Sequence, residues 1–204
     1  MLAGFVSFEG IDGSGKTTVS RLVAESLRAE GHTVHLTHEP TKTWLGDAVR
    51  HATDDDVGPI AESFLFLADR AAHQTDIRAH LDKGELVLCD RYADSTYAYQ
   101  GARLEGLVKD PIRFLRRASE LWMLRPDLTI LLRIPAELGR KRIEGRPNLI
   151  RFEDLAFLEK VAANYDRLAR SRRFTVLDGT RSPEEVTFDA VSAIRKRLTP
   201  PQKR

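Results

Sequence analysis

Eight residues near the start of the chain have the types and spacing of a phosphate-binding loop. The run Gly10-Ile11-Asp12-Gly13-Ser14-Gly15-Lys16-Thr17 matches the pattern G-x-x-x-x-G-K-[ST]. Its glycines let backbone N–H groups turn toward phosphate oxygens, and the following helix N-terminus adds partial positive charge. Lys16 is then expected to reach the β- and γ-phosphates of a nucleotide, and Thr17 to ligate Mg²⁺. A chance glycine-rich turn is disfavoured, because an apolar strand precedes the run and an amphipathic helix follows it.

The same loop occurs in small GTPases, which need a further N-K-x-D sequence to recognise guanine. Neither Asn148 nor Asn164 begins such a sequence. The segment Asp55-Asp56-Val57-Gly58 matches D-x-x-G, but it follows a polar, acidic run and not a strand. We interpret it as a solvated loop, so a GTP-dependent switch is disfavoured.

A second candidate site follows the apolar run Leu86–Cys89, which reads as a strand buried on both faces. Asp90 and Arg91 come at its carboxyl end, where open parallel sheets bind ligands. Arg91 can bind a phosphate bidentately, and Asp90 can help to hold Mg²⁺ through water. The alternative is an ion pair at the end of the strand.

Helical spacing brings together two further pairs of side chains. Phe66 and Arg70 are four residues apart in a predicted helix, so they share one face, where a ring can stack on a base. The alternative places Phe66 in the core and Arg70 in an ion pair. Thr96 and Gln100 are also four apart and can offer hydrogen bonds to a base or sugar, although simple packing would explain them equally.

Elements that would position these residues alternate along the chain. Apolar runs predict strands at 5–8, 33–37, 86–89, 128–134 and 174–177. Helical patterns are predicted at 16–30, 44–49, 60–81, 110–123, 135–143 and 153–169, and in a last helix that follows the capping sequence at Ser182. Right-handed crossovers between such strands give an α/β fold with a five-stranded parallel sheet covered on both faces. We expect a single domain over residues 1–204.

Composition narrows the class of partner and compartment. The 204 residues include 32 Lys and Arg and 30 Asp and Glu, and this near balance argues against nucleic acid as a partner. Cys89 is the only cysteine, so no internal disulfide is needed, and we expect it to be buried filler. No signal peptide and no apolar run near the ~20 residues of a membrane span are apparent, which favours a cytoplasmic protein without a membrane partner. The basic end at 199–204 is expected to be a flexible tail.

Further motifs carry a resemblance to a known family. They are Phe8-Glu9-Gly10-Ile11-Asp12-Gly13, Glu39-Pro40, Phe66-Leu67-Ala68-Asp69-Arg70, Asp90-Arg91-Tyr92, Ser95-Thr96-Tyr97-Ala98-Tyr99-Gln100-Gly101 and Arg125-Pro126-Asp127-Leu128. In their order and spacing the sequence resembles thymidylate kinases over essentially the whole chain. The resemblance implies a three-layer P-loop NTPase fold with a short lid, transfer of the γ-phosphoryl of Mg-ATP to dTMP, and usually a homodimer.

The resemblance also implies roles for individual residues. It places dTMP against Glu39, Pro40, Phe66, Arg70, Arg91, Ser95, Thr96, Tyr99 and Gln100. Tyr99 is expected to pack against C2′ of the sugar and to exclude a 2′-hydroxyl. Asp12 is expected near the transferring group, where it would orient Mg²⁺ water or the acceptor phosphate. No strong general base is needed, since the acceptor phosphate is already anionic, and catalysis would rest on alignment and charge neutralisation.

A basic segment at about 142–152 resembles the lid of one subclass of the family. Some members carry an arginine in the phosphate loop, but this chain has Gly13-Ser14 there. Arg142, Arg146 and Arg151 are therefore expected to supply one or two charges to the β–γ bridge of ATP, with Arg146 the first choice as the internal arginine finger. The alternative is a solvated, charged loop.

Two other functions stay open on the sequence. One is a kinase for another (deoxy)nucleoside monophosphate or for a deoxynucleoside, which the groups at Phe66 and Thr96–Gln100 argue against. The other is a nucleotide-binding regulatory module without turnover, which is disfavoured by the intact residues Asp12, Lys16, Thr17 and Arg91.

Overall fold

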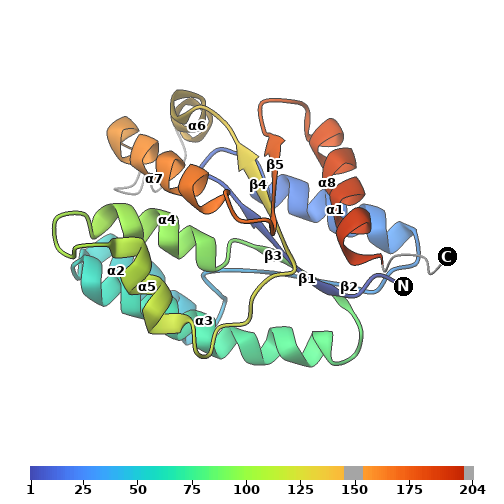
Figure 1. The fold of residues 1–204 in the computed structure, drawn as a ribbon, viewed down its shortest axis with the longest axis horizontal. Helices are drawn as coiled ribbons and strands as arrows, with labels where there is room; N and C mark the ends of the chain where they lie inside the picture. Colours follow the sequence, from blue (N-terminus) through green and yellow to red (C-terminus); the bar gives the residue numbers. More distant parts are fainter. Residues whose placement is uncertain (145–153, 200–204) are drawn as a thin grey trace.

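The computed structural model describes residues 1–144 and 154–199, and a five-stranded parallel sheet lies at its centre (Figure 1). The strands are β1 (Gly4–Glu9), β2 (Val34–His38), β3 (Leu86–Asp90), β4 (Leu128–Arg133) and β5 (Phe174–Asp178). Their order across the sheet is β2-β3-β1-β4-β5, and every neighbouring pair is parallel. The predicted α/β fold with a five-stranded parallel sheet is confirmed.

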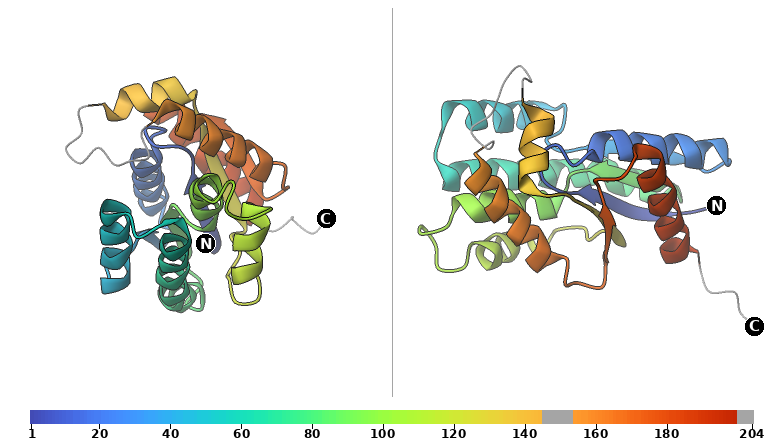
Figure 2. Two further views of the ribbon diagram at one scale, coloured as in Figure 1. Left: turned by 90° about the vertical axis from the view of Figure 1, so that its left-hand side faces the viewer. Right: turned by 90° about the horizontal axis from the view of Figure 1, so that it is seen from above.

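Helices cover both faces of the sheet and give the expected three layers. They are α1 (Lys16–Ala29), α2 (Trp44–Asp55), α3 (Pro59–Leu81), α4 (Ala93–Arg103), α5 (Pro111–Ser119), α6 (Ala136–Ile143), α7 (Leu155–Leu168) and α8 (Pro183–Leu198). Helices α1 and α8 pack together on one face. Helices α3, α4 and α7 lie on the other face, with α2 packed outside on α3, α5 on α4 and α6 on α7 (Figures 1 and 2).

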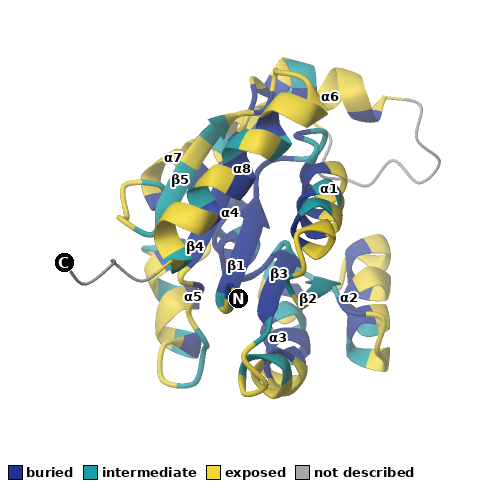
Figure 3. Ribbon diagram, turned by 90° about the vertical axis from the view of Figure 1, so that its right-hand side faces the viewer, coloured by how far each residue is buried: buried dark blue, intermediate teal, exposed yellow. Residues whose placement is uncertain are grey.

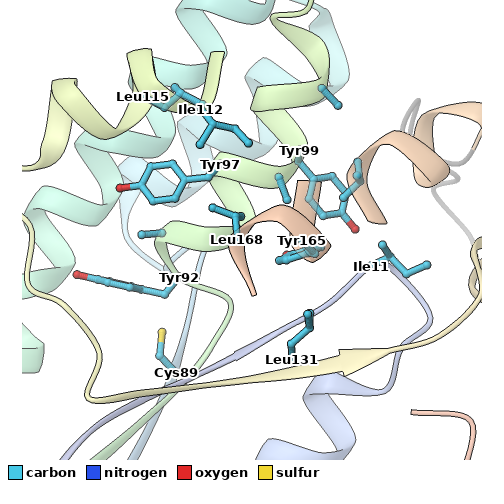
Figure 4. Close-up of a cluster of buried hydrophobic side chains, with 14 of the residues drawn as sticks. Ile11, Cys89, Tyr92, Tyr97, Tyr99, Ile112, Leu115, Leu131, Tyr165 and Leu168 are labelled. Carbon is cyan, nitrogen blue, oxygen red and sulfur yellow. The ribbon is translucent and has the colours of Figure 1, made fainter. Parts of the chain in front are cut away.

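The central strands are buried on both sides, so each one contributes to two separate cores (Figure 3). In β1, Val6 and Phe8 join the core under α1 and α8, whereas Phe5 joins the core under α3, α4 and α7. The second core is rich in tyrosine and also contains Cys89, which is fully buried as expected (Figure 4). Its thiol donates a hydrogen bond to the backbone oxygen of Arg91 at 2.9 Å.

Three helix predictions need correction. Helix α4 was not predicted, because nearly all of its residues are buried and no polar face reveals the helical period. Helix α2 runs on to Asp55, six residues past its predicted end, so the start of the acidic run is helical rather than a loop. Helix α5 ends at Ser119, earlier than predicted, and its N-terminus is capped by the side chain of Asp110.

None of the helices in residues 1–144 and 154–199 has the length and apolar character needed to cross a lipid bilayer.

Candidate active site

The phosphate loop connects β1 to the N-terminus of α1 at the carboxyl edge of the sheet. Gly13 has φ +79°, and a Cβ atom there would lie 2.4 Å from the backbone oxygen of Gly139 in α6. Only glycine permits this close approach, which sets α6 directly against the loop.

Lys16 lies almost fully buried inside the loop. Its Nζ donates to the backbone oxygen of Ile11 at 2.9 Å and approaches Ser14 Oγ at 3.5 Å. Burial, aided by the positive charge of Arg91, lowers the pKa of Lys16 to about 8, against the opposing effect of nearby carboxylates. An anionic phosphate bound in the loop would therefore stabilise the charged form of Lys16, because burial has removed the water that would otherwise solvate its ammonium group.

A candidate Mg²⁺ position lies beside the loop, where β1 and β3 run side by side. Thr17 Oγ1 donates to Asp90 Oδ2 at 2.5 Å, so the two predicted metal-binding side chains are in contact. The other carboxylate oxygen of Asp90 is buried and has no hydrogen-bond partner among the described residues. Hard oxygen donors at the edge of a phosphate site suit a Mg²⁺ that keeps several waters, so these residues fit the ion.

Arg91 stands at the centre of the site and takes an unusual backbone conformation with φ +66°. Its guanidinium forms an ion pair with Asp12, approaches Ser95 Oγ at 3.3 Å and lies 5.2 Å from the ring centroid of Tyr99. The hydroxyl of Tyr99 donates to Asp12 Oδ2 at 2.8 Å and accepts from the Asp12 backbone N at 2.9 Å. Burial raises the pKa of Tyr99, which keeps this hydroxyl a neutral donor at physiological pH.

A cavity of about 330 Å³ opens beside this group, a size within the range of small-ligand sites. Seven predicted site residues line it: Asp12, Pro40, Phe66, Arg91, Ser95, Tyr99 and Gln100. Four more lining residues come from α2: Val49, Arg50, Thr53 and Asp54. Asp12 and Arg91 join the cavity to the phosphate loop, so one continuous site has a phosphate cradle at one end and an aromatic-lined pocket at the other.

Three predicted substrate residues lie behind the wall of this cavity. Arg70 is only 1% exposed and donates to Glu39 Oε2 at 2.6 Å and to Thr96 Oγ1 at 2.9 Å. His73 contacts the other oxygen of Glu39 at 3.0 Å. The Nε and Nη1 atoms of Arg70 are buried without a partner among the described residues, so the guanidinium keeps unused donors.

The sequence profile of the family described as thymidylate kinase matches residues 8–190. This chain belongs to the thymidylate kinase family. It is 44% identical over 193 residues to a "Probable thymidylate kinase" of Methanoculleus marisnigri, covering 93% of each chain. A protein of the same description from Natronomonas pharaonis is 41% identical over 198 residues, covering 95% of this chain and 98% of the relative. Membership of this family makes the chain an ATP-dependent phosphotransferase.

Glu9 also belongs to the site. It lies in one of the motifs that carry the family resemblance, but no role was predicted for it. Its buried carboxylate accepts from the Tyr92 backbone N at 2.9 Å, from Ser95 Oγ at 2.6 Å and from the Tyr165 hydroxyl at 2.9 Å. Burial, and then the charge of Asp94, raise the pKa of Glu9 to about 7. The sequence does contain one indication of a role for Glu9, since it is a single acidic residue at the end of an apolar strand.

Arg50 and Tyr165 were also missed. Arg50 lines the cavity from α2, and its Nη2 is held by the backbone oxygen of Thr41 at 2.9 Å and by Asp47 at 2.6 Å. Tyr165 reaches the site from α7 and lies edge-on to Tyr99, with ring centroids 6.5 Å apart (Figure 4). Neither residue sits in a motif, so only the fold brings them to the site.

Arg142 contacts the phosphate loop and does not line the cavity. Its Nη1 donates to the backbone oxygens of Gly13 at 3.2 Å and Gly179 at 3.0 Å. It lines a hollow of about 120 Å³ with residues of the loop, including Ser14 and Gly15. Two other lid arginines that sequence reasoning selected, Arg146 and Arg151, lie outside the described residues.

Proposed function

We propose that this chain transfers the γ-phosphoryl group of Mg-ATP to the 5′-phosphate of dTMP and so produces dTDP and ADP. The observation that carries the proposal is the continuous site, in which Asp12 and Arg91 join a phosphate loop to a pocket lined by Phe66 and Tyr99. The relatives' description as thymidylate kinases supports the choice of acceptor.

The acceptor would bind with its phosphate at Arg91 and its base beside Phe66. Arg91 is paired with Asp12, and an incoming phosphate would compete with this carboxylate for the same guanidinium. Arg70 lies behind the pocket wall, so its unused donors would meet a base carbonyl only after that wall rearranges, and the contact would then satisfy buried donors that are costly to leave unpaired. Gln100 lines the same pocket, although its amide already donates to Glu62 at 3.0 Å.

Preference for deoxyribose is assigned to Tyr99. Its ring is clamped between the Asp12 hydrogen bonds and the aromatic ring of Tyr165, so it cannot easily move aside for a 2′-hydroxyl. Replacement by phenylalanine keeps the ring, whereas replacement by alanine removes it. Discrimination against UMP is expected to fall partly in Tyr99→Phe, which keeps the ring but loses the hydrogen bonds to Asp12, and to be lost in Tyr99→Ala.

The donor would lie along the loop from Gly10 to Thr17. Lys16 would contact the β- and γ-phosphates, and Mg²⁺ held by Thr17 and Asp90 would neutralise charge on the same oxygens. An oxygen of the acceptor phosphate attacks the γ-phosphorus in line, and the bond from that phosphorus to the ADP oxygen breaks. Asp12 and Arg91 align the two phosphates, and the anionic acceptor makes a strong general base unnecessary.

The proposal keeps an arginine finger in a lid at about 142–152, with Arg146 as first choice. Arg142 already contacts the loop backbone, so its charge is near the donor phosphates without any rearrangement. Arg146→Ala is expected to lower kcat by about 100-fold or more with little change in either KM. Arg142→Ala and Arg151→Ala are the matched controls, and an unchanged kcat in Arg146→Ala would transfer the role to whichever of these two loses turnover.

The experiment that tests the function is ADP release from Mg-ATP with dTMP, dUMP, UMP, dCMP, dGMP and thymidine offered separately. The proposal expects strong dependence on dTMP with UMP a poor acceptor. Preference for another monophosphate would keep the kinase and overturn the thymine assignment. ATP binding without release of ADP by any acceptor would identify a binding module instead.

Domain organisation, oligomeric state and cellular compartment are part of the same proposal. We expect a single domain over residues 1–204 that works as a cytoplasmic homodimer. Cys89 is buried and forms no disulfide, so the chain needs no oxidising compartment. Sedimentation of the purified chain at micromolar concentration tests the dimer, and a monomer mass would overturn it. Of the tail expected at 199–204, only Thr199 belongs to the described residues.

A further inference from the structure

Two histidines and two carboxylates gather on the surface at the amino end of the sheet, away from the site just described. His35 comes from β2, Asp76 and His80 lie one turn apart on α3, and Glu85 lies in the turn before β3. Candidate ligand atoms of His35, Asp76 and His80 all lie within 4.8 Å of one another. The phosphoryl-transfer chemistry uses none of these four side chains.

The two imidazoles present the same nitrogen to one carboxylate. His35 Nε2 lies 2.9 Å from Asp76 Oδ2, and His80 Nε2 lies 3.6 Å from Asp76 Oδ1. The rings are stacked with centroids 3.6 Å apart and planes inclined by 9°. Two imidazolium rings at this distance would repel each other strongly, so the arrangement favours at least one neutral ring.

Glu85 fixes the proton of His80 on the far side of the ring. Its Oε2 lies 2.6 Å from His80 Nδ1, and an ionised carboxylate can only accept this hydrogen bond. The proton of neutral His80 is therefore on Nδ1, and the Nε2 lone pair points toward Asp76. A carboxylate that holds the outer nitrogen of a histidine is the usual support of a metal-ligating histidine.

We propose that His35, Asp76 and His80 form a binding site for a transition-metal dication, best matched by Zn²⁺, with Glu85 orienting His80 from behind. Two imidazoles and one carboxylate are a ligand set that Zn²⁺ uses with water in the fourth position. Zinc–nitrogen bonds of about 2.0–2.1 Å require the two stacked rings to turn until both Nε2 lone pairs point at one ion beside Asp76. Asp76 is half exposed, which leaves the site open to the solvent for entry of the ion.

The charge of the surroundings favours a cation over an anion. Asp76 and Glu85 supply two negative charges, and Lys83 is a cation close enough to act on Glu85. Nitrogen ligands select against Mg²⁺, which prefers oxygen donors, so the ion of the phosphate site would not fill this one.

The ion would join the last turn of α3 to β2. His35 lies four residues before Glu39, or about 13 Å along an extended strand, so the ion would stay remote from the transferring phosphate. It would instead stabilise the helix that carries Phe66, Arg70 and His73. The expected consequence is higher stability of the folded chain with unchanged turnover.

The test uses the full chain without a polyhistidine tag, stripped with chelator and kept in excess Mg²⁺ so that the phosphate site is filled. Zn²⁺ is titrated in competition with a chromophoric chelator, and Co²⁺ serves as a spectroscopic probe. The expected result is one equivalent of Zn²⁺ per chain, the visible absorption of tetrahedral Co²⁺ with nitrogen ligands, and a higher unfolding temperature.

Variants separate this site from adventitious binding. His80→Ala and Asp76→Asn are expected to weaken Zn²⁺ binding by about 100-fold, and Glu85→Gln by about 10-fold. His51→Ala, an exposed histidine on α2, is the matched control and should bind like the unsubstituted chain. Circular dichroism and kinase activity of each stripped variant show that it is folded.

Two results would overturn the proposal. One is Zn²⁺ binding that is equally strong in His80→Ala and in the control, which would place the ion elsewhere. The other is an absence of saturable binding and of a Co²⁺ spectrum in the unsubstituted chain.

Discussion

Arg91 combines a left-handed backbone conformation with a charge directed at Asp12 and the acceptor pocket. We predict that Arg91→Ala lowers kcat/KM for dTMP by about 1,000-fold, because the proposed contact between the guanidinium and the acceptor phosphate is lost, while ATP binding changes little. Steady-state kinetics with dTMP and direct titration with ATP measure the two effects. Equal loss of both would mean that Arg91 serves the donor as much as the acceptor.

The backbone of the same residue allows a control that separates charge from conformation. A Cβ atom is strained at φ +66°, whereas glycine is not. Arg91→Gly is therefore expected to be more stable to chemical denaturation than Arg91→Ala by about 1 kcal/mol, although both lose the guanidinium. Equal stability of the two variants would show that the conformation relaxes without the arginine.

Glu9 makes the stability of the protein depend on pH. Its pKa of about 7 in the folded chain lies above the ordinary 4.5, so between these values the folded state binds more protons than the unfolded state. The free energy of unfolding contributed by Glu9 is thus fully present below pH 4.5 and is lost as pH rises through 7. We predict that Glu9→Gln flattens this dependence, with a gain over the unsubstituted chain of up to about 3 kcal/mol at pH 8.

Urea denaturation across pH 4 to 8 measures the Glu9 effect. Glu25→Gln, which removes an exposed carboxylate of α1, is the matched control and should keep the original pH dependence. A Glu9→Gln variant that is less stable at pH 8 than at pH 5 by the original margin would contradict the prediction.

At the residue scale, the sequence predicted the parts of the site that lie in contiguous motifs. The phosphate loop, Asp90, Arg91 and Phe66 were all placed at one site, because the motif itself fixes their local geometry. Glu9 gained a role only from partners 83 or more residues away in the chain, and Arg50 from its place on the cavity wall, which no local pattern encodes. Arg70 was expected in either a base contact or an ion pair; it forms the ion pair, and two of its donor atoms have no partner in the described part of the chain.

Helix α2 lies against the loop after β2 with no room between them. A Cβ atom on Gly46 would lie 1.9 Å from the backbone oxygen of Thr41, which also receives Arg50. We predict that Gly46→Ala displaces α2, destabilises the fold by about 2 kcal/mol and raises KM for dTMP by about 10-fold, with KM for ATP unchanged. Kinetics and urea denaturation check this, with His51→Ala on the same helix as control.

The Gly46→Ala prediction has a clear contrary outcome. If KM for ATP rose as much as KM for dTMP, the displacement would have reached the phosphate loop, and α2 would not be a separate wall of the acceptor pocket.

At the element scale, strongly periodic helices and apolar strands were predicted well, whereas α4 was missed. Helix α4 is enclosed by α3, α5 and α7, so tertiary packing and not its own pattern determines it. The ends of α2 and α5 were misplaced, α2 by ending too early in the prediction and α5 by ending too late, since no glycine or proline directly follows either end in the sequence.

The whole molecule is organised by a sheet whose strands feed both cores. Because β1, β3 and β4 contribute side chains to both cores, unfolding of one core would expose the strands that also support the other core. We predict a single cooperative thermal transition, with equal calorimetric and van't Hoff enthalpies of about 140 kcal/mol near 60 °C. Two resolved transitions in a calorimetric scan would contradict the single-domain proposal, and scans with and without dTMP control for ligand effects.

The alternation of strands and helices was enough to predict the parallel sheet and its layers. The order β2-β3-β1-β4-β5 was not predicted, because apolar strands carry no mark of their neighbours. The position of the candidate metal-binding cluster depends on this order, since β2 must lie at the edge for His35 to meet α3 on the surface.

The sealed position of Cys89 makes the natural chain a ready background for labelling. Burial raises the pKa of its thiol well above the ordinary value, and the side chain has no exposed surface in the folded state. Maleimide dyes are therefore expected not to react with Cys89 in the folded chain. They would react with a cysteine introduced on the surface, for example at Phe188 on α8, which is 75% exposed. Fluorophores and spin labels can be attached one at a time, without first deleting a native cysteine.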